Sequence, residues 1–134
     1  MVTLTPELGY LVWSVVLLLV HLVVMACFKT ANIGLRYGLG PRDGDEDPHD
    51  ATTQRLIRAF RNYLETWPAF IALALTLAVV GVGTTTTALG AAIWFWMRVA
   101  YVPIYAFGIP YIRTVVWAVS LIGLVMMLWP LIFG

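Results

Sequence analysis

Four long segments with an apolar pattern account for most of the chain. They cover about residues 8–28, 53–82, 88–107 and 111–133. Each is close to or longer than the ~20 residues that an α-helix needs to cross a bilayer. The 53–82 segment begins as a polar helix and becomes apolar only from Trp67. The pattern predicts an all-α fold of four transmembrane helices in a single domain, residues 1–134.

The connections between these segments differ in length and polarity. The stretches GVGTTTT (81–87) and GIP (108–110) are short, so the spans that they join should run antiparallel. The stretch from about 29 to 52 is long, glycine-rich and charged, and predicts one loop. Its acidic run DGDED (43–47) lacks the glycine and glutamate that an EF-hand requires at positions 48 and 54. We interpret this run as solvated and predict no metal site.

Composition supports an integral membrane protein. Hydrophobic residues make up 61% of the 134 residues and charged residues 11%, against about 25% charged residues in soluble domains. A chain of this length cannot bury so much apolar surface in water, so membrane lipid is an expected partner. A net charge of +1 gives no basis for nucleic-acid binding. The single cysteine, Cys27, excludes an intrachain disulfide and is interpreted as a small buried apolar residue.

The distribution of Lys and Arg predicts the orientation. The N-terminal segment, the 81–87 turn and the C-terminal end carry neither residue, and no basic region precedes the first span, which we read as retained. By the positive-inside rule, the 29–52 loop and the 108–110 turn face the cytoplasm and both termini lie outside. The basic residues on the cytoplasmic side are Lys29, Arg36, Arg42, Arg55, Arg58, Arg61 and Arg113.

A polar stripe opens the 53–82 span, in the stretch RAFRNYLETWPAF (58–70). At ~100° per residue, five polar side chains fall on a helix face about 120° wide. Pro68 follows this stripe and predicts a kink. The stripe consists of Arg55, Arg58, Arg61, Asn62 and Glu65.

The 88–107 span carries a second polar face, on which Arg98, Tyr101 and Tyr105 are spaced i, i+3, i+7. A lone arginine at this depth costs at least about 2.5 kcal/mol, so Arg98 requires a partner. Glu65 is the only acidic residue inside an apolar segment, and we predict that the two form an ion pair. One carboxylate cannot neutralise the remaining arginines, so the excess positive charge indicates an anionic ligand with carboxylates or phosphates.

Four other interpretations remain open at this point. In the first, the Arg98–Glu65 pair serves only to hold the helices in register. Arg55, Arg58 and Arg61 fit contacts with lipid phosphates. His21 is either hydrogen-bonded within the bundle or a proton or ligand group. A solute or proton pathway that uses Glu65, Arg98 and His21 is the least favoured, because four short spans leave little room for a lumen.

The stretches RLIRAFRNYLET and MRVAYVPIYAFGIPYIRTVVW resemble the MAPEG family, the membrane-associated proteins in eicosanoid and glutathione metabolism. The resemblance covers about residues 53–120 and is similar to the bacterial branch of the family. It implies a four-helix bundle in the bacterial inner membrane that assembles as a homotrimer. Glutathione would lie between neighbouring subunits near the cytoplasmic side.

The resemblance also implies roles for particular residues. Arg113 matches the arginine that holds the glutathione thiolate, and Thr114 follows where several members have a small hydroxyl residue. Glutathione would be a co-substrate for conjugation to a lipophilic electrophile or for reduction of a hydroperoxide. The alternative is a non-catalytic protein of this fold that binds an anionic lipid or a small anion. The other matching glutathione contacts are Arg58, Arg61, Asn62, Glu65, Arg98, Tyr101 and Tyr105.

Two departures from the family pattern stand beside this resemblance. Tyr101 occupies a position where some eicosanoid-metabolising members have histidine. The 29–52 loop carries Arg36 but has glycines at positions 34, 38 and 40 in place of a denser basic cluster.

Overall fold

The computed structural model describes residues 3–33 and 50–134. Within these ranges the fold is four α-helices: α1 (Pro6–Ile33), α3 (Ala51–Val80), α4 (Thr85–Ala106) and α5 (Pro110–Phe133). All four are long and apolar enough to cross a membrane. The four predicted spans are therefore confirmed as helices. Arg36, Arg42 and the acidic run 43–47 lie outside the described residues.

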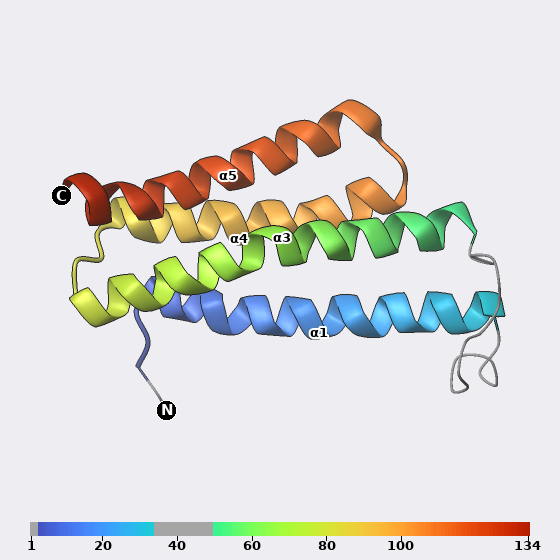
Figure 1. The fold of residues 1–134 in the computed structure, drawn as a ribbon, viewed down its shortest axis with the longest axis horizontal. Helices are drawn as coiled ribbons and strands as arrows, with labels where there is room; N and C mark the ends of the chain where they lie inside the picture. Colours follow the sequence, from blue (N-terminus) through green and yellow to red (C-terminus); the bar gives the residue numbers. More distant parts are fainter. Residues whose placement is uncertain (1–2, 34–49) are drawn as a thin grey trace.

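The helices run up and down along one long axis (Figure 1). Both termini lie at the same end of the bundle as the α3–α4 turn, and the α4–α5 turn lies at the opposite end. Helices α3 and α4 are central, because α1 packs against both of them and α5 packs against both from the other side. Helix α3 changes direction near its middle, the part that contains Pro68.

The helix ends differ from the predicted boundaries. Residues 29–33 belong to α1, whereas the sequence pattern placed them in the loop. Polarity set the predicted boundary, but no glycine or proline occurs between Gly9 and Gly34. Helix α4 begins at Thr85, inside the predicted turn, because Thr84 and Thr87 form a capping box. Asp50 caps α3 by accepting a 2.8 Å hydrogen bond from the Thr53 amide.

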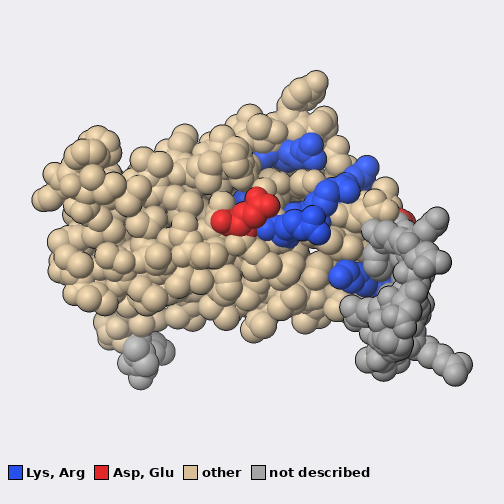
Figure 2. Space-filling model, viewed as in Figure 1, with Lys and Arg blue, Asp and Glu red and all other residues tan. Residues whose placement is uncertain are grey.

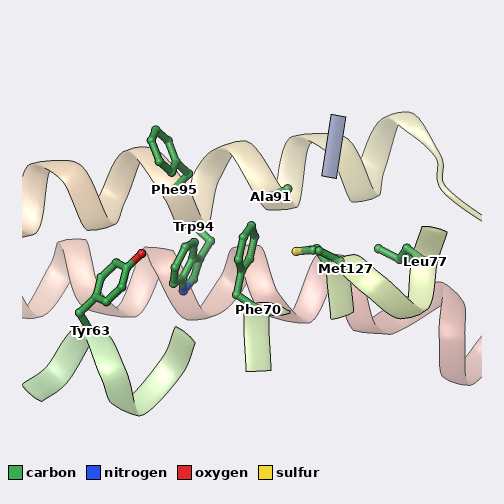
Figure 3. Packing of buried hydrophobic residues seen from close by; sticks show 8 residues of the cluster. Tyr63, Phe70, Leu77, Ala91, Trp94, Phe95 and Met127 are labelled. Carbon is green, nitrogen blue, oxygen red and sulfur yellow. The ribbon is translucent and has the colours of Figure 1, made fainter. Parts of the chain in front are cut away.

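An aromatic core joins the central helices (Figure 3). The rings of Phe70 and Trp94 stack with centroids 4.1 Å apart and planes 9° apart. Trp94 also contacts Tyr63, at 5.7 Å between centroids. Many other large apolar side chains are exposed, as expected where lipid replaces water. The cluster consists of Tyr63, Phe70, Ala74, Leu77, Ala91, Trp94, Phe95 and Met127.

Two glycines set the contact between α4 and α5. A Cβ added to Gly90 would lie 2.6 Å from the Gly123 carbonyl oxygen, and one added to Gly123 would lie 2.5 Å from the Gly90 oxygen. Only residues without a side chain allow this close approach, which replaces hydrophobic packing as a source of helix association in lipid. Helix α5 leans away from α4 towards its own N-terminus (Figure 1).

A polar network ties α1 to α3 through Ser14. The Tyr63 hydroxyl donates to the Ser14 carbonyl at 2.7 Å, and the Trp67 indole N–H donates to the Ser14 hydroxyl at 2.9 Å. The Ser14 hydroxyl in turn donates to the Leu11 carbonyl at 2.6 Å. These bonds fix the rotation of α3 relative to α1.

Replacing Tyr63 by phenylalanine should weaken this link while keeping the ring packing. We expect the free energy of unfolding, measured by SDS titration in mixed micelles, to fall by about 0.6–1.7 kcal/mol. Tyr111→Phe is the matched control, because Tyr111 is 85% exposed. Equal stability of the two variants would show that the bond from Tyr63 to the Ser14 carbonyl contributes nothing.

Candidate functional site

Charged side chains gather towards one end of the bundle (Figure 2). On the face shown, Lys and Arg lie in the half near the α4–α5 turn, with an acidic patch beside them, and the other half carries no charge. Helix α3 contributes three arginines, and α1, α4 and α5 contribute one basic residue each among the described residues. These residues are Lys29, Arg55, Arg58, Arg61, Arg98 and Arg113.

Arg98 lies in the interior between α4 and α3, with only 1% of its surface exposed. Its Nη2 donates to Asn62 Oδ1 at 2.8 Å. Its Cζ lies 4.6 Å from the Tyr101 ring centroid and 5.8 Å from that of Tyr63. The Nε and Nη1 atoms are buried and have no hydrogen-bond partner in the described part of the chain. Arg98 therefore keeps unused donors.

The predicted ion pair between Arg98 and Glu65 is wrong. Glu65 is exposed and makes no hydrogen bond or ion pair with Arg98; its carboxylate acts on the guanidinium only through its electrostatic field. Both Asn62 and Glu65 belong to the polar stripe, but it is Asn62 that faces α4. Among the described residues, no carboxylate contacts the buried arginine, so its charge is unbalanced.

The typical free energies of insertion, hydrogen bonding and cation–π contacts explain how Arg98 stays buried without a carboxylate partner. Insertion scales put the cost of a central arginine at about 2.5–3.5 kcal/mol. A hydrogen bond to a charged group contributes about 1.5–3 kcal/mol, and a cation–π contact about 0.5–2 kcal/mol. Asn62 and the two tyrosine rings together offset the cost. The guanidinium can thus carry its positive charge in the interior without a carboxylate partner among the described residues.

Tyr105 lies between two further arginines. The Arg58 Nε donates to the Tyr105 hydroxyl at 3.0 Å, and the Arg113 Cζ lies 4.9 Å from the Tyr105 ring centroid. The Tyr105 ring contacts the Tyr101 ring at 5.4 Å between centroids. Guanidinium and phenol groups from α3, α4 and α5 thus form one continuous series, which we call the arginine–tyrosine cluster: Arg58, Asn62, Arg98, Tyr101, Tyr105 and Arg113.

All six members of the arginine–tyrosine cluster were predicted as site residues. The remaining three predicted site residues, Arg61, Glu65 and Thr114, are exposed. Within the described ranges no hydrogen bond or ring contact joins them to the cluster. Tyr63 contacts Arg98 but was missed, because it lies off the polar stripe. The one feature of the sequence that could have indicated Tyr63 is its position next to Asn62.

The structure bears on two interpretations made for α1: the hydrogen-bonded alternative for His21 and the burial of Cys27. His21 is buried, with 2% exposed, and its ring packs edge-on against Phe60 at 5.1 Å. Neither ring nitrogen makes a hydrogen bond of good geometry with the described residues, although the Leu56 backbone lies close to the ring. Cys27 is exposed and not buried. It lies on the outer face of α1, where the exposed side chains are apolar and suit contact with lipid. In the described part of the chain, His, Cys, Asp and Glu form no group that could hold a metal.

Replacing Asn62 by leucine should deprive the buried Arg98 of the hydrogen-bond acceptor that Asn62 provides. We expect the free energy of unfolding to fall by about 1.5–3 kcal/mol, the contribution of a hydrogen bond to a charged group. Asn62→Asp keeps an acceptor at the same place and should retain most of the stability. A leucine variant as stable as the aspartate variant would mean that Arg98 does not depend on this contact. SDS titration in mixed micelles provides the measurement.

Comparison with known proteins supports the resemblance seen in the sequence. The model of the MAPEG family matches residues 10–133, which is nearly the whole chain and a range that contains the arginine–tyrosine cluster. A search of individual curated proteins finds no match. Members of this family generally use glutathione. Since the match covers all four helices, the chain belongs to the MAPEG family.

Proposed function

We propose that the protein is a membrane-bound, glutathione-dependent transferase or peroxidase that acts on lipophilic electrophiles, with glutathione as co-substrate. One observation carries the proposal: three arginines converge on Tyr101 and Tyr105, and no carboxylate contacts them among the described residues. Glutathione supplies what this arrangement lacks, because it has two carboxylates and a thiol that ionises.

Under this proposal, the residues of the arginine–tyrosine cluster have two roles. Arg58 and Arg98 bind the carboxylates of glutathione, with Asn62 and the tyrosine hydroxyls as further hydrogen-bonding groups. Arg113 holds the thiolate, since a nearby positive charge favours the ionised sulfur and lowers the thiol pKa. Arg61, Glu65 and Thr114 form the exposed rim, which a neighbouring subunit completes in the homotrimer that we propose by family analogy.

The chemistry follows from an ionised sulfur close to lipid. In conjugation, the thiolate attacks an electrophilic carbon, and the leaving group departs with its electron pair. In reduction, the thiolate takes the outer oxygen of a hydroperoxide, which leaves an alkoxide that gains a proton. A second glutathione then converts the resulting sulfenic acid to a disulfide and water. Apolar substrates would enter from the bilayer that surrounds the helices.

The proposed location is the bacterial inner membrane, with the α4–α5 turn in the cytoplasm and both termini outside. The support is the distribution of charge: on the face shown in Figure 2, Lys and Arg gather in the half of the bundle that contains the α4–α5 turn. This orientation places the cluster on the side from which cytoplasmic glutathione would enter.

The second candidate function is non-catalytic binding of an anionic lipid or a small anion. The exposure of Arg58 and Arg61 favours it, because exposed arginines at the end of a span suit lipid phosphates. Any anion that reaches Arg98 would also satisfy its two unused nitrogens.

A turnover assay separates the two functions. Purified protein in proteoliposomes is supplied with glutathione and either a chlorodinitrobenzene or a fatty-acid hydroperoxide. The proposal predicts conjugate or alcohol formation well above the protein-free rate, and Lys29→Ala, which removes a positive charge outside the cluster, should match the wild type. No turnover with either electrophile, in a folded protein that retains bound anionic lipid, would favour the second function.

A further inference from the structure

The α4–α5 turn has a defined hydrogen-bond pattern. The Gly108 amide donates to the Tyr105 carbonyl at 3.0 Å, and the Ile109 amide donates to the Ile104 carbonyl at 3.2 Å. Together these bonds form a Schellman motif, in which the residue after the helix adopts the left-handed conformation. Gly108 has a φ of 72°, which suits glycine and strains other residues. The turn therefore ends α4 and starts α5 within three residues.

A side chain from α3 lies directly against this turn. A Cβ added to Gly108 would lie 2.9 Å from the Cζ of Arg55, and 3.1 and 3.2 Å from its two Nη atoms. The guanidinium thus occupies the space that any other residue at position 108 would fill. It also lies at the C-terminal end of α4, where the helix dipole favours a positive charge. Helix α4 has no basic residue in its own last turn, so Arg55 supplies this charge from the neighbouring helix.

Few other groups fix the start of α5. Its N-cap residue, Ile109, makes no side-chain capping bond, and Pro110 occupies the first turn. At this end α5 also leans away from α4 (Figure 1). Arg113 lies in the first turns of α5, and its contact with the cluster is the cation–π contact with Tyr105. The position of Arg113 therefore depends on the position of the turn.

We propose that Arg55 is a positioning residue: by packing against Gly108, it fixes the α4–α5 turn and so keeps Arg113 over Tyr105. Arg55 itself does not contact the cluster through any hydrogen bond or ring contact within the described residues. The structural part of this inference is independent of the reaction. Its catalytic consequence rests on the proposed function of Arg113.

A spin label tests the structural part. In a Cys27→Ser background, Tyr111→Cys provides a single labelling site in the first turn of α5, on a side chain that is 85% exposed. Arg55→Ala should increase the mobility of this label, and Gly108→Ala should do the same, both by displacing the guanidinium and by straining the turn at its φ of 72°. Lys29→Ala removes a positive charge from the same end of the bundle and should change nothing. A label that is equally immobile in wild type and Arg55→Ala overturns the inference.

Kinetics test the catalytic consequence. Arg55→Ala should lower kcat at least about tenfold with a nearly unchanged KM for glutathione, since a misplacement of about 1 Å can cost about 10²-fold. It should also reduce the thiolate absorbance of bound glutathione, and Arg55→Lys should restore part of both. A mobile label combined with full thiolate absorbance would overturn the link to Arg113. A mobile label in a protein whose wild type forms no thiolate would leave Arg55 as the support of the turn and discard the proposed function.

Discussion

Replacing Arg113 by alanine should leave glutathione bound but with its thiol protonated at neutral pH. The arginine–tyrosine cluster keeps Arg58, Arg98 and Asn62, which bind the carboxylates under our proposal, so affinity should change little. The positive charge next to the sulfur is lost, and the thiol should titrate near its ordinary value of about 8.5. Because one preorganised electrostatic group in an active site contributes about 10²–10³ in kcat, turnover should fall by that factor.

The ultraviolet difference spectrum of bound glutathione, recorded across pH, measures this effect directly. Arg113→Lys keeps a positive charge on a shorter, non-planar group and should retain part of the thiolate at neutral pH. Lys29→Ala is the control for charge removed elsewhere at this end of the bundle. A thiolate band of unchanged intensity in Arg113→Ala would show that another group ionises the sulfur.

The second large effect concerns stability. Gly123→Ala places a methyl group 2.5 Å from the Gly90 carbonyl oxygen and 2.9 Å from the Trp94 amide nitrogen. Both neighbours are backbone atoms, so the methyl group can be accommodated only if α4 and α5 move apart. We expect the free energy of unfolding to fall by about 1–3 kcal/mol, as for overpacked cores, and by more for Gly123→Val.

Gly9→Ala provides the matched control, because a Cβ at Gly9 meets no atom within 4 Å. In α1 that substitution should be neutral or stabilise by up to about 1 kcal/mol, since alanine loses less entropy in a helix. SDS titration of both variants in the same micelles gives the comparison. If Gly123→Ala unfolded at the same SDS fraction as Gly9→Ala, the close packing of α4 on α5 would not contribute to stability.

The four spans could be predicted from the sequence because each contains a long apolar segment, and a bilayer leaves such segments few alternatives to a helix. The same reasoning identified Arg98, since a charged residue inside an apolar segment is conspicuous. The helix ends were less accurate. The capping box at Thr84 and Thr87 extended α4 into a stretch that polarity alone assigned to a turn.

The partner of Arg98 could not be predicted from the pattern alone. Asn62 and Glu65 lie only about 60° apart on the helix face, so either could have faced α4. The rotation of α3 decides between them, and it depends on tertiary contacts such as the bond from Tyr63 to the Ser14 carbonyl. The requirement for charge neutrality favoured Glu65, but two tyrosine rings and one amide stabilise Arg98 instead.

The contact between Gly90 and Gly123 could likewise not be predicted from the sequence. Glycines occur throughout this chain, and nothing in the local sequence indicates which two will meet across helices. The packing of Arg55 against Gly108 could not be predicted either, because it joins the start of α3 to a turn that follows α4. These contacts depend on how the helices pack, and their positions in turn define the geometry of the cluster.

The decisive experiment is isothermal titration of glutathione into the detergent-purified protein, with the ultraviolet difference spectrum recorded alongside. If the protein uses glutathione, binding should saturate with a dissociation constant between about 1 μM and 1 mM, the usual range for enzyme substrates. A thiolate band should be present at neutral pH and absent in Arg113→Ala. No heat and no band at saturating glutathione, in a folded protein, would overturn the proposed function and leave anionic lipid or another small anion as the ligand of the arginine–tyrosine cluster.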